Sequence, residues 1–302
     1  MTGTGDPPRD ALERVTVVIV TFNSAHCIEA LARGLAGEPN VIVVDNASAD
    51  DTCERVRTLM PSARLVTMPA NRGYGVANNT ALALVQTEFA LLLNPDCLTD
   101  ATRIAALVQA MQAWPTATLA VPQLTDASGQ LQVNYSWPRD AWAPKTGEAT
   151  GVLNVGYACA AVMLIRMERL APIGFFDPLF FLYYEDEDLC LRVFQARGQI
   201  LVLPEVRITH LSRGSVRGAR PWLAEYGRGF HHAQSKLLFT WKHAGADAAR
   251  RQRRRVLASS VLNLLARVLM PSPRHLARAW GRWRGLRALN LDALSRERAL
   301  AG

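Results

Sequence analysis

Short apolar runs alternate with longer helical patterns over the first hundred residues of the chain. Four runs, at residues 15–20, 41–45, 64–68 and 89–93, have the continuous aliphatic character of strands buried on both faces. Helical patterns lie between them at residues 24–36, 48–60 and 74–85. This alternation predicts an α/β fold built on a mainly parallel sheet.

The pattern changes after residue 99. The next expected elements are a helix and three extended segments, at residues 100–114, 118–121, 158–165 and 200–209. Residues 122–150 are rich in turn formers and contain Trp137, which is typical of an irregular loop that holds an acceptor.

Helical patterns return in the second half of the chain. Leu189, Cys190, Val193 and Phe194 form one helical stripe that ends at Gly198. From about residue 221 onward the chain is predicted to be helical, with a break at the prolines of 271–273.

Composition narrows the class of protein. Of 302 residues, 49% are hydrophobic and 20% charged, and no run of 18 apolar residues predicts a membrane-spanning helix. The first fourteen residues lack the apolar core of a signal peptide. Five widely spaced cysteines without a paired motif argue against a disulfide framework or a zinc cluster, so we expect a cytoplasmic protein.

Positive charge is concentrated at the end of the chain. Residues 250–302 hold thirteen arginines and two acidic residues, whereas the remainder of the chain has a net charge of −3. This asymmetry favours an anionic partner. Two interpretations stay open: residues 250–302 lie peripherally on an anionic membrane surface, with Trp280 and Trp283 at headgroup depth, or they pack on the body or on a second subunit of a homo-oligomer.

Polar residues follow the predicted strands at the edge where an open α/β sheet binds ligands. They are Thr21 and Asn23, Asp45, and the pair Asn94 and Asp96. The first turn lacks the glycine pattern of a dinucleotide site, which argues against nicotinamide or flavin chemistry. Asp45 is placed either to accept a hydrogen bond from a base or ribose, or to cap its own turn.

Two further features suit a phosphorylated ligand and a metal. Residues 71–79 combine Asn71, Arg72, Gly73 and Asn79 with a predicted helix start, which favours anionic groups, although an ordinary loop fits as well. Asp96 is a carboxylate suited to Mg²⁺ or Mn²⁺, which prefer oxygen ligands.

Four consecutive acidic residues, 185–188, follow an aromatic and apolar run. Asp186 lies at the expected start of a helix, where a carboxylate stays ionised while partly desolvated, and this suits a general base. Arg192 lies one turn beyond Asp188 and is placed to pair with it. A solvated acidic turn is the structural alternative.

Taken in order, these motifs resemble those of the inverting family 2 glycosyltransferases of the GT-A fold, in their rhamnosyltransferase-like branch. The matching segments are residues 18–23, 43–50, 71–75 with Asn79, 94–96, 175–177, 185–192 and His210 with the five residues after it. The resemblance implies a Rossmann-like, mainly parallel sheet flanked by helices, followed here by a helical basic C-terminal tail.

The resemblance also implies roles for individual residues. Asp186 would be the catalytic base, and Asp96 and His210 would bind the metal. Trp137, Glu185, Asp188 and Arg192 would orient the acceptor or its loop. The donor would be held by Thr21, Asn23, Asp45, Asn71, Arg72, Gly73, Asn79 and Asn94. Asn94 stands where the family's metal motif has its first acid.

The implied reaction is transfer of L-rhamnose from dTDP-L-rhamnose to a glycan or lipid-linked glycan, with UDP-galactose or GDP-mannose as alternative donors. We expect a flexible N-terminus (1–14), a nucleotide-sugar half (15–99), an acceptor and catalytic half (100–240) and a helical extension (241–302).

Other functional classes fit less well. A nucleic-acid-binding protein acting through the arginines is disfavoured by the acidic body and the lack of a stacking or zinc motif. A pyrophosphorylase would need a glycine-rich basic loop, which residues 21–27 do not form. A non-catalytic scaffold is disfavoured by the presence of both Asp96 and Asp186.

Overall fold

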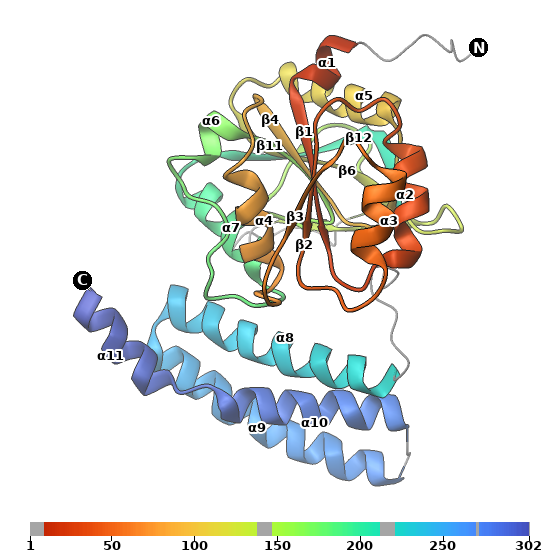
Figure 1. Cartoon of the computed structure of the whole chain (residues 1–302). Coiled ribbons are helices and arrows are strands. Elements are labelled where there is room, and N and C mark those ends of the chain that lie inside the picture. Colours follow the sequence, from red (N-terminus) through yellow and green to blue (C-terminus); the bar gives the residue numbers. More distant parts are fainter. Residues whose placement is uncertain (1–8, 138–146, 212–220, 270–271, 302) are drawn as a thin grey trace. The chain divides into compact units, whose positions relative to one another are not determined.

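A computed structural model describes residues 9–137, 147–211, 221–269 and 272–301 (Figure 1). The chain divides into two compact units. We call Met1–Asp177 with Asp186–Arg217 the sheet unit, and Pro178–Glu185 with Gly218–Gly302 the helical unit.

Within the described residues, ten strands of the sheet unit form one sheet, whose main path runs β3-β2-β1-β4-β11-β6-β12-β5. Strands β3, β2, β1 and β4 are parallel neighbours, as the sequence predicts. β11 is antiparallel to both β4 and β6, and β12 is parallel to β6. The strands are β1 (Val15–Thr21), β2 (Val41–Asp45), β3 (Arg64–Thr67), β4 (Phe89–Leu93), β5 (Cys97–Leu98), β6 (Ala117–Thr125), β7 (Leu131–Gln132), β9 (Leu153–Asn154), β11 (Val162–Arg166) and β12 (Gln199–His210), and β8 (Tyr135–Ser136) pairs separately with β10 (Tyr157–Ala158).

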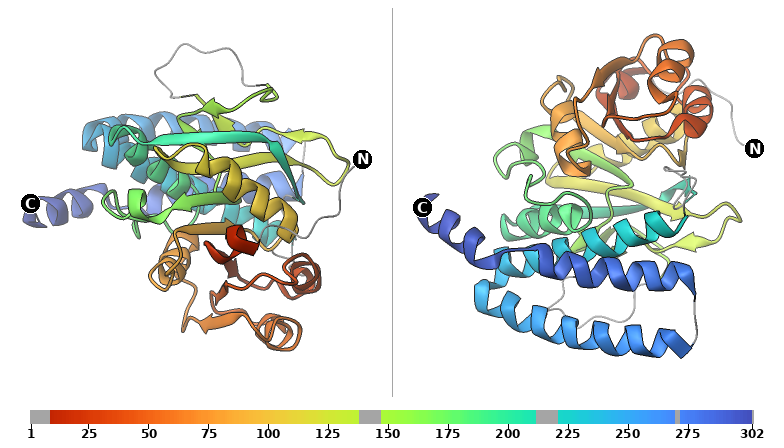
Figure 2. Two further views of the ribbon diagram at one scale, coloured as in Figure 1. Left: turned by 90° about the horizontal axis from the view of Figure 1, so that it is seen from above. Right: turned by 60° about the horizontal axis from the view of Figure 1, so that its bottom comes forward.

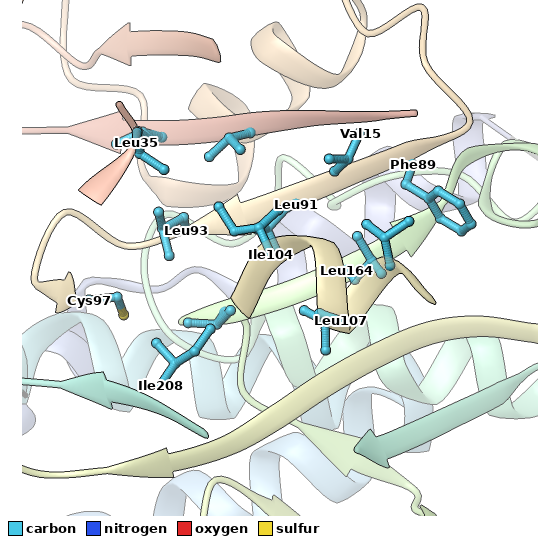
Figure 3. Close-up of a cluster of buried hydrophobic side chains, with 14 of the residues drawn as sticks. Val15, Leu35, Phe89, Leu91, Leu93, Cys97, Ile104, Leu107, Leu164 and Ile208 are labelled. Atoms are coloured by element: carbon cyan, nitrogen blue, oxygen red, sulfur yellow. The ribbon is translucent and has the colours of Figure 1, made fainter. Parts of the chain in front are cut away.

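Helices cover both faces of this sheet, which explains why its central strands are apolar throughout. One buried cluster joins the sheet to α1, α2, α3 and α5, and Figure 3 shows Leu91 and Leu93 of β4 close to Ile104 and Leu107 of α5. The other cluster joins the sheet to α4, α6 and α7. These helices are α1 (Arg9–Glu13), α2 (Ile28–Gly34, after the 3-10 turn Ala25–Cys27), α3 (Thr52–Leu59), α4 (Tyr74–Leu82), α5 (Ala101–Gln112), α6 (Met167–Leu170) and α7 (Glu185–Gln195).

The structure differs from the sequence prediction in detail. The prediction that Phe194 belongs to the buried helical stripe is wrong. Phe194 is 50% exposed, because Leu189, Cys190 and Val193 already fill the buried face of α7. The irregular loop begins later than predicted, because β6 continues to Thr125. Residues 9–13, expected to be flexible, form α1.

The helical unit contains α8 (Pro221–Ala244), α9 (Ala246–Leu269), α10 (Pro273–Ala288) and α11 (Leu291–Ala301). The predicted domain boundary at 240/241 falls inside α8. Figure 2 shows α8, α9 and α10 side by side. Among the described helices, none has the length and apolar character needed to cross a bilayer. The predicted break at Pro271, and residues 212–215 after His210, lie outside the described residues.

Candidate active site

The ends of β1 and β2 meet at a buried carboxylate. Thr21 Oγ1 donates a hydrogen bond to Asp45 Oδ1 at 2.9 Å. Ser48 donates to the same carboxylate through its backbone N–H (2.9 Å) and its hydroxyl (2.5 Å). Asn23, in the left-handed region at φ 52°, donates its N–H to Ser48 Oγ at 2.8 Å. Asp45 is 2% exposed, so its carboxylate fixes the turn after β2, as the capping interpretation expects.

The loop before α4 is organised by Asn46. Its Nδ2 donates to Asn71 Oδ1 (3.0 Å) and to the Gly73 carbonyl (3.1 Å), and its Oδ1 accepts from the Arg72 N–H (2.9 Å). Gly73 has φ 89°, a conformation that L side chains rarely adopt. The loop therefore has a defined shape directly before the N-terminus of α4, and the Arg72 side chain is exposed there.

A carboxylate and an imidazole meet where β4 ends and β5 pairs with β12. His210 Nε2 lies 3.5 Å from Asp96 Oδ1, and Asp96 is 2% exposed. Asp96, Cys97 and His210 offer ligand atoms that all lie within 4.8 Å of one another. The Cys97 thiol donates to the Ala161 carbonyl at 3.6 Å, and burial raises its pKa. Asp96 and His210 thus offer an oxygen and a nitrogen atom of the kind that bind divalent metal ions.

Residues 157–161, which comprise β10 and its connection to β11, contact both Asn94, directly after β4, and Asp186. On one side, the Asn94 N–H donates to the Ala161 carbonyl (2.8 Å), and the Tyr74 hydroxyl contacts the Ala160 carbonyl (2.8 Å) and Asn94 Oδ1 (3.1 Å). On the other side, the Ala160 N–H donates to Asp186 Oδ2 at 3.4 Å. The structure therefore brings residues 94–96 and Asp186 to one short segment.

Asp186 is partly buried and accepts several hydrogen bonds. The Tyr157 hydroxyl donates to Oδ2 at 3.1 Å, and the Glu187 N–H donates to Oδ1 at 2.9 Å. Desolvation raises the pKa of Asp186, while these hydrogen bonds and one from Cys159 act in the opposite direction. Burial and the Asp186 charge raise the pKa of Tyr157, which keeps this phenol protonated as a donor.

Two predicted site residues of α7, Asp188 and Arg192, hold the loop of residues 173–177 in place. Arg192 Nε pairs with the fully buried Asp188 at 2.9 Å, and its Nη atoms donate to the carbonyls of Ile173, Gly174 and Phe175. Asp188 and Arg192 therefore tie α7 to this loop.

Asn79 supports the same loop from α4. Its Nδ2 donates to the Phe176 carbonyl (2.7 Å), and its Oδ1 accepts from the Phe176 N–H (3.0 Å). These two hydrogen bonds occupy the Asn79 side-chain amide, which was predicted to bind the nucleotide-sugar donor. The Asn79 side chain is thus placed to support the loop.

The backbone before α7 is strained. Tyr183 and Tyr184 both have φ 69°, which is costly for bulky residues and is held only where packing requires it. Within the helical unit, His232 contacts both tyrosine rings edge-on, at 5.7 and 5.5 Å between centroids. These contacts stabilise the turn from which Glu185, 6% exposed, begins α7.

Comparisons with known proteins identify the family. Residues 16–169, just over half of the chain, match Glycosyl transferase family 2. The chain belongs to glycosyl transferase family 2. This glycosyltransferase is 24% identical over 265 residues to an N-acetylglucosaminyl-diphospho-decaprenol L-rhamnosyltransferase of Mycobacterium tuberculosis, a match covering 76% of this chain and 85% of the relative.

Solved structures show the same fold. The mannosyltransferase PcManGT of Pyrobaculum calidifontis, in complex with GDP-Man and Mn²⁺, matches with a TM-score of 0.54 at 18% identity and covers 91% of this chain and 86% of that structure. Residues 1–349 of S. aureus TarS, in complex with UDP-GlcNAc, match with a TM-score of 0.53 at 16% identity, covering 90% and 91%. The predicted family and the GT-A fold are confirmed.

Sequence reasoning did not single out every residue of this site. Tyr157 belongs to it through a hydroxyl group that no motif marks, and Tyr74 and Asn46 lie inside the matching segments 71–75 and 43–50 but receive no role from the sequence. Trp137 lies partly buried after β8, directly before residues 138–146, which the structure does not describe.

Proposed function

We propose that this glycosyltransferase moves L-rhamnose from dTDP-L-rhamnose to a hydroxyl group of a lipid-linked glycan, with inversion at the anomeric carbon. The mycobacterial relative supports both substrates, because its name gives the sugar as L-rhamnose and the acceptor as N-acetylglucosaminyl-diphospho-decaprenol. UDP-galactose and GDP-mannose are the rival donors.

The nucleotide end of the donor is assigned to the ends of β1 and β2 and to the loop before α4. Thr21, Asn23 and Asp45 line the nucleoside subsite. The diphosphate lies against residues 71–73 and the N-terminus of α4, where backbone N–H groups and Arg72 favour negative charge.

Asp96 and His210 would hold Mg²⁺ or Mn²⁺, with Asn94 as a neutral neighbour. Their spacing of 3.5 Å supports this assignment, because two ligands of one small cation lie about 3 Å apart. A divalent ion bound there would neutralise the charge that develops on the leaving diphosphate.

Asp186 acts as the general base. Its carboxylate takes the proton of the acceptor hydroxyl as that oxygen bonds to the anomeric carbon and the bond to the diphosphate breaks. Asp188, Arg192 and Asn79 position the adjoining loop, and Glu185 and Trp137 orient the acceptor. The observation that carries the proposal is the contact of residues 157–161 with both Asp186 and the 94–96 turn.

A donor panel tests this function. The protein is incubated with an N-acetylglucosaminyl-diphospho-lipid and each of dTDP-L-rhamnose, UDP-galactose and GDP-mannose, and products are followed by mass spectrometry. We expect the highest kcat/KM with dTDP-L-rhamnose. A higher value with either rival would refute the donor, and equal activity of Asp186→Asn and the control Glu205→Gln, an exposed β12 residue, would refute the base.

A further inference from the structure

An aromatic and basic surface lies on α10 of the helical unit. Trp280, Trp283, Arg284 and Arg287 are spaced i, i+3, i+4 and i+7, so they share one side of the helix. Trp280 is 48% exposed, and both arginines are exposed. We call these four residues the α10 face.

The indole rings of the α10 face are held in an ordered stack. The Trp280 and Trp283 rings stack with centroids 5.0 Å apart and an angle of 17° between their planes. The Arg287 guanidinium lies 4.6 Å from the Trp283 centroid. Two large aromatic side chains are therefore arranged outside the core of the unit, where exposed tryptophan usually marks an interaction surface.

Close packing against α8 sets the rotation of α10. A Cβ atom on Gly281 would lie 2.1 Å from the Tyr226 carbonyl oxygen, and one on Gly285 would lie 2.4 Å from the Phe230 carbonyl oxygen. These glycines permit the two helices to approach backbone to backbone. Because Gly281 and Gly285 occupy the α8 side of α10, the α10 face lies on another side of the helix, away from that contact.

The charge of residues 218–302, which form most of the helical unit, favours an anionic partner. Residues 218–302 contain fifteen arginines and two lysines but four acidic residues, a net charge of +13. Arg250 pairs with both Asp247 and Asp292, and Arg228 pairs with Glu225, so three of the four acids serve two arginines. Exposed arginines of α9 and α10 include Arg251, Arg254, Arg255, Arg274 and Arg278.

We infer that the α10 face docks on an anionic phospholipid bilayer, with α10 lying in the membrane interface. Indole rings partition to the headgroup region, and each arginine near an anionic surface strengthens binding. None of the described helices can span a bilayer, so the contact lies along the surface. A single-stranded nucleic acid fits less well, because base stacking needs open ring faces and both Trp280 and Arg287 already contact the Trp283 ring. This docking concerns the helical unit and does not depend on which sugar is transferred.

Vesicle flotation of the full-length protein tests the inference. Vesicles of equal parts phosphatidylcholine and phosphatidylglycerol are compared with pure phosphatidylcholine vesicles, and tryptophan emission is recorded. We expect binding to the anionic vesicles with a blue shift, weaker binding at high salt, and little binding to the neutral vesicles. The double variant Trp280→Ala/Trp283→Ala should lose about tenfold or more in partition coefficient.

Matched controls separate this surface from general effects. Trp114→Ala removes a 40% exposed tryptophan of the sheet unit and should bind like the wild type. Arg284→Gln/Arg287→Gln should weaken binding, whereas Arg55→Gln/Arg57→Gln, which removes two exposed arginines of α3, should not. Circular dichroism and retained donor binding check that each variant folds.

Three results would overturn the inference. The first is equal partitioning of the wild type and the α10-face variants, and the second is equal binding to neutral and anionic vesicles. The third combines two observations: the wild type binds no vesicles, and light scattering shows a wild-type dimer that Trp280→Ala/Trp283→Ala abolishes. If the wild type transfers no sugar in the donor panel but still binds anionic vesicles, the proposed reaction is refuted and the docking inference is not.

Discussion

The hydrogen bond from Tyr157 to Asp186 predicts a measurable shift in the pH dependence of sugar transfer. Tyr157→Phe removes a hydroxyl that lies 3.1 Å from Asp186 Oδ2 and stabilises the ionised carboxylate. Hydrogen bonds to charged groups contribute about 1.5–3 kcal/mol. The lower end applies to this partly exposed site, and about 1.5 kcal/mol corresponds to about one pKa unit.

The direction of the shift follows from the proposed role of Asp186 as the general base. Loss of the Tyr157 hydroxyl as a hydrogen-bond donor raises the pKa of Asp186, so a higher pH is needed to ionise this carboxylate. We expect the acid limb of kcat/KM to move upward by about one pH unit. The plateau at high pH, where the base is ionised in both proteins, should change little.

The assay is initial-rate transfer across the acid limb and the plateau, for the wild type and two variants. Tyr135→Phe is the matched control, because Tyr135 lies on β8 opposite β10 and its hydroxyl bonds to Gln123 and the Gly147 carbonyl. An unshifted acid limb in a folded Tyr157→Phe protein, or an equal shift in Tyr135→Phe, would show that Tyr157 does not act through the base.

Three further substitutions test the site and the sheet unit. Asp186→Asn should lower kcat by about 10²–10⁴-fold while nucleotide-sugar binding, read by thermal shift, is retained; a rate near wild type would exclude this base. Asp96→Ala should abolish the additional thermal stabilisation that Mn²⁺ gives in the presence of nucleotide sugar, and an unchanged Mn²⁺ response would place the metal elsewhere. Glu38 is 5% exposed, and burial raises its pKa to about 7, so its contribution to stability is greatest below the unfolded value and falls as pH rises through about 7. Glu38→Gln should therefore increase the free energy of unfolding by up to about 3 kcal/mol at pH 8 and by little at pH 5, and equal effects at both pH values in chemical denaturation would contradict the burial argument.

The first four strands were predictable because both of their faces are buried, which leaves a continuous apolar signal. β11 was harder to place, because its insertion between β4 and β6 depends on pairings distant in sequence. β10 merged with β11 in the prediction, since the apolar residues 158–165 run through both.

Site residues were predictable where a motif marks a strand end or a helix start, as at Asp96 and Asp186. Their assigned roles stay predictions until tested. Tyr157 carries no such signal, because a tyrosine in a two-residue strand has no periodic pattern. Asn79 shows the opposite limit: its position in a motif suggested ligand binding, whereas its amide is bonded to the Phe176 backbone.

The connection between β10 and β11 has a consequence for how substrate preference can change. Its peptide groups bond to both Asn94 and Asp186, and the Tyr157 and Cys159 side chains bond to Asp186 as well. The part of the spacing between residues 94–96 and Asp186 that rests on these peptide groups does not depend on the side chains of residues 160 and 161. Descendants of this enzyme could exchange one acceptor for another through mutations in the surrounding loops, while the reaction distance is inherited unchanged.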